Sequence, residues 1–311
     1  MKPKVLQYGR LMPSLEKQLD QTFAMHRLAD EADPRAFLAA HGPEFVGLAT
    51  GGFADAALIE ALPSLRVISS FGVGVDRIDL VAAGRRGILV GNTPDVLNDC
   101  VADLAIGLMI DVARAMSASD RYLRRGDWPK ANYPLQHRVS GKRLGIVGLG
   151  RIGKAIAKRA AGFDMELRYH NRRPAADTTI AYEASLLDLA RWADFLVIVV
   201  PGGAATRHLI NAAVLDALGP EGFLVNVARG SVVDEPALIH ALQNKRIAGA
   251  ALDVFENEPN VPAELMRLDN AVLLPHVASA TFETRAAMAQ RVFDNLREFF
   301  ANGRLISAIS A

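Results

Sequence analysis

The sequence predicts an α/β protein with two Rossmann-like, doubly wound parallel-sheet lobes and a cleft between them. Apolar, strand-like runs alternate with helical patterns along almost all of the 311 residues, and this alternation is typical of parallel sheets with helical crossovers. In the second half of the chain the runs are apolar throughout, as expected for strands that helices cover on both faces. The third observation is a glycine-rich turn between a strand-like run and a helical run, which is how doubly wound sheets often begin.

The first lobe is expected to be a small α/β layer of about a hundred residues. Strands are expected at residues 4–8, 45–49, 66–70 and 88–91, and helices at residues 11–21, 34–41, 54–61 and 79–86. Asp76 is expected to cap a helix that begins near Ile78, because aspartate is a preferred N-cap residue.

A long helix is expected to bridge the two lobes between residues 98 and 125, where apolar side chains recur at helical spacing. Gly107 is the weakest point of this pattern, and a single glycine costs about 1 kcal/mol relative to alanine, which a helix tolerates. Residues 126–129 end the pattern, and an irregular segment runs on to Ser140. In that segment Trp128 and Tyr133 either shape a pocket or a dimer contact, or only pack the loop.

The second lobe is expected to contain the more strongly apolar strands. Strands are expected at residues 143–147, 166–169, 195–199, 223–226, 249–253 and 271–274, and helices at residues 153–161, 185–190, 212–218 and 235–244. The amphipathic stretch 282–302 is expected to be one helix that returns to pack on the first lobe. The predicted lobes are therefore 1–98 plus 283–311 and 99–282.

Composition limits the classes of partner. A formal net charge of +1 gives no electrostatic basis for binding nucleic acid or a membrane surface. The longest apolar run, at residues 195–200, is too short to span a bilayer, and the N-terminus lacks the apolar stretch of a secretory signal. Cys100 is the only cysteine, which excludes an internal disulfide and favours a reducing compartment. We expect a cytoplasmic protein, and no group of histidine, cysteine and carboxylate residues has the spacing of a metal site.

Residues 148–153 read Gly-Leu-Gly-Arg-Ile-Gly and match the G-x-G-x-x-G fingerprint of dinucleotide-binding lobes. The strand-like run before them and the helical run after them supply the context that the motif requires. The first glycine permits a tight turn, the second lets backbone approach a pyrophosphate, and the third lets the helix pack closely on the strand. The N–H groups of the helix N-terminus then face the phosphates. The expected cofactor contacts are Leu149, Gly150, Arg151 and Ile152.

The end of the next strand indicates which dinucleotide binds. About twenty residues past the fingerprint, an NAD enzyme carries an acidic residue for the ribose 2′-hydroxyl, whereas arginine accommodates a 2′-phosphate. Here the strand is followed by Asn171, Arg172 and Arg173, and no acidic residue occurs before Asp177. Because each guanidinium can fork onto two phosphate oxygens, these residues favour NADP(H) over NAD(H).

Four runs in the second half of the chain carry a family resemblance. They are residues 225–230 (Val-Asn-Val-Ala-Arg-Gly), Asp234-Glu235, residues 252–259 (Leu-Asp-Val-Phe-Glu-Asn-Glu-Pro) and residues 274–279 (Leu-Pro-His-Val-Ala-Ser). In this order the runs resemble the signatures of the D-isomer-specific 2-hydroxyacid dehydrogenases, and the resemblance covers nearly the whole chain. Residues 69–76 and 171–173 resemble the glyoxylate/hydroxypyruvate reductase and hydroxyphenylpyruvate reductase branch. The resemblance implies reduction of a small 2-oxo acid, such as glyoxylate, hydroxypyruvate or an aryl pyruvate, to the D-2-hydroxy acid. It also implies that the first lobe binds substrate and the second binds the dinucleotide.

Three residues in these runs suit that reaction chemically. Arg229 can hold the substrate carboxylate and polarise the carbonyl through paired N–H bonds. His276 is the natural general acid, because an imidazole titrates near neutral pH. Glu258 can accept a hydrogen bond from the second imidazole nitrogen, which orients the ring and stabilises its protonated form. The resemblance assigns the same roles to Arg229, Glu258 and His276.

The first lobe is expected to supply further substrate contacts. In residues 71–76 (Phe-Gly-Val-Gly-Val-Asp) two glycines follow a strand, so that backbone N–H groups can form an anion-binding nest. Val73 and Gly74 are therefore the predicted carboxylate contacts, and Gly51 follows a neighbouring strand. Simple tight turns are the alternative for each of these segments.

The resemblance also implies cofactor contacts at Pro201, Thr206, Ala228, Asp253, His276 and Ser279. Asp253 is the expected acceptor for the nicotinamide carboxamide. Between Pro201 and Thr206 the chain departs from the family pattern, and its small residues predict a flexible loop. Asp103 occupies a position that is usually polar, with no role assigned. Four histidines without an acidic partner at a telling spacing are expected to be surface or packing residues: His137, His170, His208 and His240.

Two alternative functions use the same fold. A dinucleotide-sensing regulatory protein would keep the cofactor site and bind a partner, but the 171–173 segment argues against an NAD(H) sensor. A phosphoglycerate dehydrogenase-like enzyme is the nearest enzymatic alternative, and the lack of a regulatory domain after the closing helix disfavours it. The resemblance also implies a homodimer that forms through the cofactor lobe.

Overall fold

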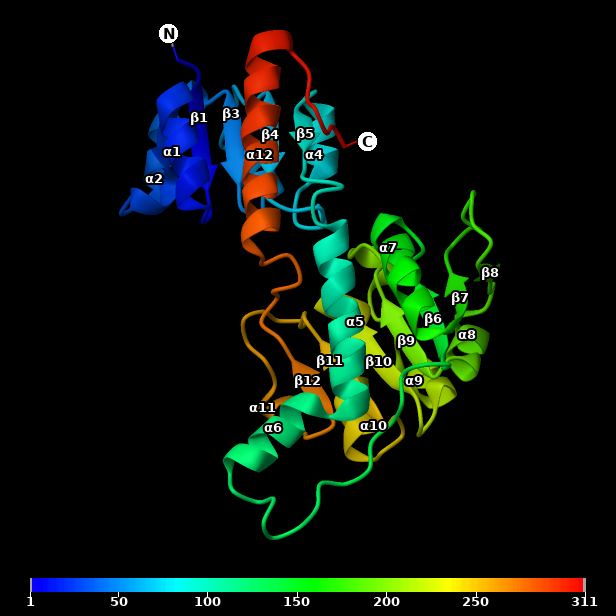
Figure 1. Ribbon diagram of the computed structural model, residues 1–311. Coiled ribbons are helices and arrows are strands. Elements are labelled where there is room, and N and C mark those ends of the chain that lie inside the picture. Colours follow the sequence, from blue (N-terminus) through cyan, green and yellow to red (C-terminus); the bar gives the residue numbers. More distant parts are fainter. Residues whose placement is uncertain (1, 310–311) are drawn as a thin grey trace. The chain divides into compact units, whose positions relative to one another are not determined.

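The computed structural model describes residues 2–309 and divides into two compact units. Unit 1 consists of Met1–Leu97 and Ala280–Ala311, and unit 2 consists of Asn98–Ser279. Each unit contains one sheet in which every strand pair is parallel, with strand order β2-β1-β3-β4-β5 in unit 1 and β12-β11-β10-β9-β6-β7-β8 in unit 2 (Figure 1). The predicted class, two doubly wound α/β lobes with parallel sheets, is confirmed.

Unit 1 contains the strands β1 (Lys4–Tyr8), β2 (Ala24–Arg27), β3 (Gly47–Thr50), β4 (Val67–Ser70) and β5 (Leu89–Gly91). Its helices are α1 (Pro13–Thr22), α2 (Pro34–His41), α3 (Ala56–Glu60), α4 (Leu80–Arg85) and α12 (Phe282–Asn302). Strand β2 was not predicted. Its sequence, Ala-Met-His-Arg, has neither β-branched residues nor alternation, and only pairing with β1 makes it a strand.

Neighbouring residues of β1 face opposite sides of the unit 1 sheet and belong to different apolar clusters. Val5 packs with α1 and α12, whereas Leu6 packs with residues of α3 and α4. The predicted return of the last helix to the first lobe is confirmed, because Val292, Leu296 and Phe299 of α12 lie in the cluster of Val5.

The N-cap of α4 is Asp79, and the prediction of Asp76 was wrong. The Asp79 carboxylate accepts a hydrogen bond from the Ala82 N–H at 2.8 Å. Isolated pairing of Ala54 with Ile78 keeps the chain extended at the position where the helix was expected to begin, and this delays its start to Leu80.

Unit 2 contains the strands β6 (Arg143–Val147), β7 (Glu166–His170), β8 (Ala181–Tyr182), β9 (Phe195–Ile198), β10 (Phe223–Asn226), β11 (Gly249–Leu252) and β12 (Ala271–Leu273). Its helices are α5 (Asn98–Arg114), α6 (Met116–Arg124), α7 (Arg151–Ala160), α8 (Leu186–Trp192), α9 (Ala212–Leu218), α10 (Glu235–Gln243) and α11 (Ala263–Met266). Helices α8, α9 and α10 cover one face of the sheet around Leu196, Leu224 and Ala250, and α5 packs with α7 and over β10 and β11. The two-residue strand β8 was not predicted.

The long helix expected at residues 98–125 is interrupted, which corrects that prediction. Ala115 has a left-handed conformation with φ of 48°, and it separates α5 from α6. The Asp111 side chain accepts hydrogen bonds from both the backbone N–H (2.8 Å) and the hydroxyl of Ser117, and so caps the new helix. Apolar spacing continues across the break, so that periodicity alone does not reveal it. Among the described residues no helix combines the length and apolar character of a membrane span.

Candidate active site

Six loops of unit 2 follow the carboxyl ends of parallel strands and therefore meet at one edge of the sheet, where ligands of open α/β sheets bind. All the predicted unit 2 site residues lie on these loops. They are residues 148–153 after β6, 171–173 after β7, 201–206 after β9, 228–229 after β10, 253–258 after β11 and 276–279 after β12.

The three glycines of the fingerprint turn have different surroundings, as predicted from their different roles. Gly148 has φ of +107°, and a Cβ at Gly153 would collide with the carbonyl group of Gly148. By contrast, a Cβ at Gly150 would meet nothing within 4 Å. The turn and the helix packing therefore need the first and third glycines, while the space at Gly150 suits a phosphate group. The first turn of α7 also presents N–H groups that the helix itself does not use.

Asn171 has a structural task in this turn. Its Oδ1 accepts a hydrogen bond from the Leu149 N–H at 2.8 Å, and this bond ties the end of β7 to the fingerprint. Leu149 is 2% exposed. Because the Leu149 N–H already donates to Asn171, the fingerprint residues best placed for phosphate contacts are Gly150, Arg151 and Ile152.

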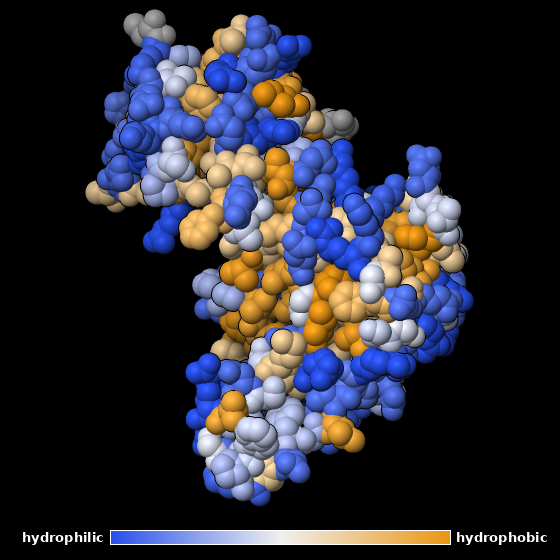
Figure 2. All heavy atoms as spheres, viewed as in Figure 1, coloured by the Kyte–Doolittle hydropathy of each residue, from blue (hydrophilic) through white to orange (hydrophobic). Residues whose placement is uncertain are grey.

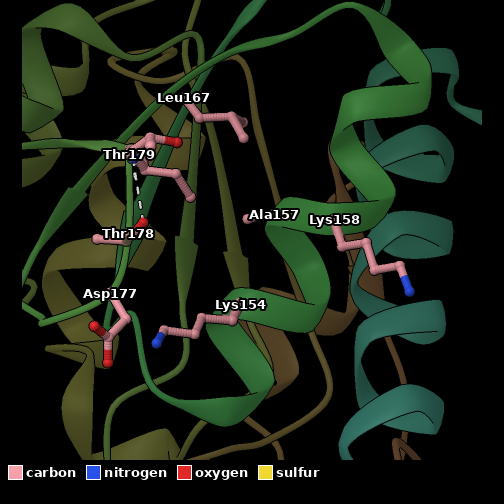
Figure 3. Close-up of a pocket in the computed structure, with 8 residues that line it drawn as sticks. Lys154, Ala157, Lys158, Leu167, Asp177, Thr178 and Thr179 are labelled. Carbon is pink, nitrogen blue, oxygen red and sulfur yellow. Dashed lines mark hydrogen bonds between the residues drawn. The ribbon is translucent and has the colours of Figure 1, made fainter.

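Arg172 and Arg173 are exposed, and neither guanidinium forms an ion pair or hydrogen bond with any residue in the range 2–309. A groove of about 600 Å³ lies between α7 and the chain that follows these arginines (Figure 3). Figure 3 shows Lys154 reaching from α7 toward Asp177, while the Ile180 N–H donates to the Thr178 hydroxyl at 3.2 Å. The end of β7 thus presents two uncompensated cations, with Lys154 on the helix beside the following loop.

His276 and Glu258 form the predicted hydrogen-bonded pair, with His276 Nδ1 and Glu258 Oε2 2.8 Å apart. The other Glu258 oxygen accepts the Phe255 N–H at 3.1 Å, so the carboxylate is held at both ends. Burial raises the pKa of Glu258, but the hydrogen bond from His276 and the charges of His276 and Arg229 outweigh it and lower the pKa overall. Glu258 is therefore an ionised acceptor, and His276 Nε2 bonds to no described residue.

Asp253 builds the turn that carries His276. The Asp253 carbonyl accepts the His276 N–H at 2.8 Å, and the two carboxylate oxygens accept the Val277 and Ala278 N–H groups at 2.7 and 2.9 Å. These bonds stabilise the left-handed conformation of His276, whose φ is 53°. Asp253 is wholly buried, and burial raises the pKa of its carboxyl group. Its expected carboxamide contact stays a prediction, and this backbone role was not predicted.

Arg229 follows β10 in a turn that Asn226 holds. The Asn226 side chain accepts the Ala228 N–H and donates to the Arg229 carbonyl, each at 3.0 Å. The Ala228 carbonyl in turn accepts from Arg229 Nη1 at 2.8 Å, which directs the guanidinium. Asn226 is 1% exposed and was not predicted as a site residue. The Ala228 N–H is used inside the turn, so this group is not a donor for a ligand.

The 201–206 loop is closed by Thr206. The Thr206 hydroxyl donates to the Pro201 carbonyl at 2.7 Å, and the Thr206 N–H donates to the Gly203 carbonyl at 3.1 Å. This bonding gives the loop a defined turn although its residues are small. Ser279, the last predicted contact of this edge, is half-buried at the end of unit 2.

His208 is partly exposed, as expected of a surface residue, and it has an acidic partner that was not predicted. His208 Nε2 lies 3.0 Å from Glu256 Oε1, and Arg207 Nη2 lies 2.7 Å from the same oxygen. His208 and Glu256 are separated by 48 positions in the sequence, so their spacing gave no sign of this contact. It links the loop that Thr206 closes to the loop that carries Glu258.

Val73 and Gly74 lie in unit 1 on the loop that follows β4. Their N–H groups donate to no described residue, as an anion-binding nest requires. The Gly51 N–H, by contrast, donates to the Tyr8 carbonyl at 3.0 Å. The structure thus leaves two of the three predicted substrate contacts with available donors.

Asp103, to which no role was assigned, forms an ion pair with Arg159 of α7 at 2.5 Å. No group of potential metal ligands occurs in the described part of the chain.

The chain is similar to known 2-hydroxyacid dehydrogenases over almost its full length. Residues 106–278 match the family model described as "D-isomer specific 2-hydroxyacid dehydrogenase, NAD binding domain". Hydroxyphenylpyruvate reductase of Plectranthus scutellarioides is 47% identical and covers 95% of each chain. 2-Ketogluconate reductase of Gluconobacter oxydans is 44% identical and covers 99% of each chain. An NADPH-dependent glyoxylate/hydroxypyruvate reductase of Sinorhizobium meliloti, solved with NADP and malonate, is 44% identical with a TM-score of 0.95 over 100% of this chain and 97% of that one.

Proposed function

The chain belongs to the D-isomer-specific 2-hydroxyacid dehydrogenase family, and on this basis we propose that it reduces a small 2-oxo acid with NADPH to a D-2-hydroxy acid. Glyoxylate, hydroxypyruvate and aryl pyruvates are the proposed substrates. The observation that carries the proposal is the His276–Glu258 pair, which lies on the same sheet edge as Arg229 and the fingerprint. The matched NAD-binding region, residues 106–278, lies entirely within unit 2, and we propose that unit 1 binds the substrate.

In the proposed mechanism the residues of the site bind the substrate, polarise its carbonyl group and deliver a proton. NADPH, when bound, supplies the hydride. Arg229 binds the substrate carboxylate and polarises the carbonyl group, and the Val73 and Gly74 N–H groups hold the carboxylate. His276 donates a proton from Nε2 to the carbonyl oxygen as negative charge develops there. Glu258 fixes the imidazole through Nδ1 and stabilises its cationic form, because its own lowered pKa keeps it ionised.

The residues of the cofactor edge fit a dinucleotide with a 2′-phosphate. The space at Gly150 and the N-terminus of α7 suit the pyrophosphate. The exposed guanidiniums of Arg172 and Arg173 suit a phosphate dianion, and they have no competing partner in residues 2–309. An NAD(P)-binding lobe follows from the family, whereas the preference for NADP(H) is our proposal.

Replacing both Arg172 and Arg173 by serine should raise the KM for NADPH by about 10²-fold and change the KM for NADH by less than about threefold. The reason is that hydrogen bonds to charged groups contribute about 1.5–3 kcal/mol each, and only NADPH carries the 2′-phosphate. Steady-state kinetics with each cofactor measure the effect. The double variant R35S/R85S, which changes two exposed arginines of unit 1, is the control. Equal changes for the two cofactors would contradict the assignment.

A spectrophotometric assay tests the proposed function. NADPH oxidation at 340 nm should be measured with glyoxylate, hydroxypyruvate, hydroxyphenylpyruvate and 2-ketogluconate, and the substrates ranked by kcat/KM. We expect turnover with at least one of these 2-oxo acids. A dinucleotide-sensing protein would bind NADPH and oxidise none of it, which would overturn the proposal.

We further propose a homodimer that forms through residues 116–140 and α5. Large apolar side chains are exposed at Met116 (54%), Leu123 (55%), Trp128 (62%) and Leu135 (100%), all in one stretch of the chain. Figure 2 shows further apolar residues gathered around α5. Exposed apolar surface of this kind is typical of association sites.

Sedimentation velocity tests the dimer. The native chain of 33.5 kDa should sediment as a species of twice that mass. The variant L123E/L135E should shift it toward the monomer, because charges in an apolar interface are left unpaired. The variant V81E/L187E, which changes two exposed apolar residues elsewhere, is the control. A native monomer at micromolar concentration would contradict the proposal.

A further inference from the structure

Unit 1 contains a buried polar network that the proposed mechanism does not use. Asn295 of α12 is 0% exposed and Ser307 is 8% exposed. Asn295 Nδ2 donates to the Ser307 hydroxyl at 3.0 Å, and Asn295 Oδ1 accepts the Ser307 N–H at 3.1 Å. Buried amides and hydroxyls cost free energy unless they are paired, so a network of this kind needs a structural or functional reason.

The network converges on the backbone of Asn92, directly after β5. The Asn92 carbonyl accepts the Ser307 hydroxyl at 2.7 Å and Asn295 Nδ2 at 3.3 Å, and the Asn92 N–H donates to the Ser307 carbonyl at 3.3 Å. The tail continues along β5, since Ala308 pairs with Gly91 and the Ile309 N–H donates to the Val90 carbonyl at 2.8 Å. A Cβ at Gly91 would lie 2.8 Å from Asn295 Nδ2, so a glycine is needed here for the close approach.

Asn92 and Thr93 in turn hold the loop after β4. Asn92 Nδ2 donates to the Val73 carbonyl at 2.8 Å, and the Thr93 N–H donates to the Gly72 carbonyl at 2.9 Å. Two consecutive carbonyls of the loop are thus anchored by the two residues that follow β5. The Gly72 carbonyl shares a peptide group with the Val73 N–H, and the Val73 carbonyl shares one with the Gly74 N–H. Because a peptide unit is planar, fixing a carbonyl also fixes the direction of the next N–H.

We propose that Asn92 is a positioning residue for substrate recognition, and that Asn295 and Ser307 support it from α12 and the C-terminal tail. The Asn92 side chain orients the Gly74 N–H by binding the Val73 carbonyl. The neighbouring Thr93 N–H orients the Val73 N–H by binding the Gly72 carbonyl. The inference rests on the proposed function, in which these N–H groups bind the carboxylate of a 2-oxo acid. It assigns to the last helix and the tail a role in substrate affinity and none in cofactor affinity.

The variant Asn92→Asp is the sharpest test, because it keeps the shape of the side chain and replaces the donor by an anionic oxygen that repels the Val73 carbonyl. The inhibition constant of oxamate, an unreactive analogue of a 2-oxo acid, should rise at least about tenfold, and the KM for the 2-oxo acid should rise with it. The dissociation constant of NADPH, measured by fluorescence titration, should stay unchanged. Asn92→Ala should show the same pattern.

Ser69→Ala is the matched control. The Ser69 hydroxyl donates to the Val292 carbonyl of α12 at 3.1 Å, so this variant also removes a buried hydrogen bond between the sheet and α12 but touches no bond of the 72–74 loop. It should lower the melting temperature and leave the oxamate constant unchanged. Ser307→Ala, which removes a single hydroxyl, should raise the oxamate constant by a few-fold without loss of folding.

The outcomes separate this inference from the proposed function. If the native protein reduces no 2-oxo acid, the proposed function fails, and the inference fails with it. If the native protein reduces a 2-oxo acid but Asn92→Asp and Ser307→Ala keep the native oxamate constant, the inference is overturned and the function stands. It is also overturned if Ser69→Ala raises the oxamate constant as much as the Asn92 variants do, since general destabilisation would then explain the effect.

Discussion

Replacing His276 by asparagine is expected to lower kcat by about 10²- to 10⁴-fold, the contribution typical of a positioned general acid. Asparagine keeps the polarity of the site but has no proton to give at neutral pH. His276 Nδ1 is bound to Glu258, and Nε2 bonds to no residue in the range 2–309, so Nε2 is the atom placed to donate. The dissociation constant of NADPH should change by less than about threefold, because the fingerprint and the end of β7 are intact.

Steady-state turnover and fluorescence titration of NADPH measure these two quantities. His240→Asn is the matched control, because the described contacts of the His240 side chain are confined to Asn244, on the far side of α10 from the core. That variant should keep native turnover. An equal loss of turnover and of NADPH affinity in the His276 variant would show that His276 supports the site structurally and does not act as the acid.

Arg229→Gln is expected to lower kcat/KM for the 2-oxo acid by about 10²- to 10³-fold, the effect of removing one strong donor from a developing oxyanion. Arg229→Lys should recover only part of this loss, because an ammonium keeps the charge but not the planar fork that binds two oxygens. The two hydrogen bonds by which Asn226 holds the turn do not use the Arg229 side chain, so the backbone of the site should persist when the bond from Arg229 Nη1 to the Ala228 carbonyl is lost.

The control for Arg229 is Arg246→Gln, which removes an exposed arginine that pairs with Asp216. Kinetics with a 2-oxo acid and circular dichroism should be measured for all three variants. If Arg229→Lys retains native kcat/KM, a simple positive charge suffices and the bidentate role is wrong.

Much of the fold was predictable because parallel strands buried on both faces leave a plain apolar signal. The runs at β6, β9 and β10 are of this kind, and the sequence placed each within a residue of its observed bounds. Strands β2 and β8 lie at sheet edges and carry polar residues, so pairing with one neighbour, and not composition, makes them strands. The break at Ala115 depends on a side-chain cap from Asp111, which apolar periodicity does not register.

The candidate site was predictable where a residue type has a specific chemistry and a loop follows a strand. Arg229, Glu258 and His276 were named on those grounds and on the family resemblance of the runs that contain them, and the structure brings Glu258 and His276, 18 residues apart in sequence, within hydrogen-bond distance. The supporting roles were not predictable, because each residue acts through a backbone turn that only the folded chain creates. Asp253 and Asn226 hold the turns of His276 and Arg229 in this way, and Asn92 holds the Val73 carbonyl.

The central claim is that this protein moves a hydride to C2 of a 2-oxo acid, and isotope labelling tests it most directly. The protein should be incubated with hydroxypyruvate and NADPH that carries deuterium at both C4 positions, and the product analysed by mass spectrometry and chiral chromatography. The account predicts D-glycerate with one deuterium at C2. Unlabelled glycerate or the L-enantiomer would contradict it.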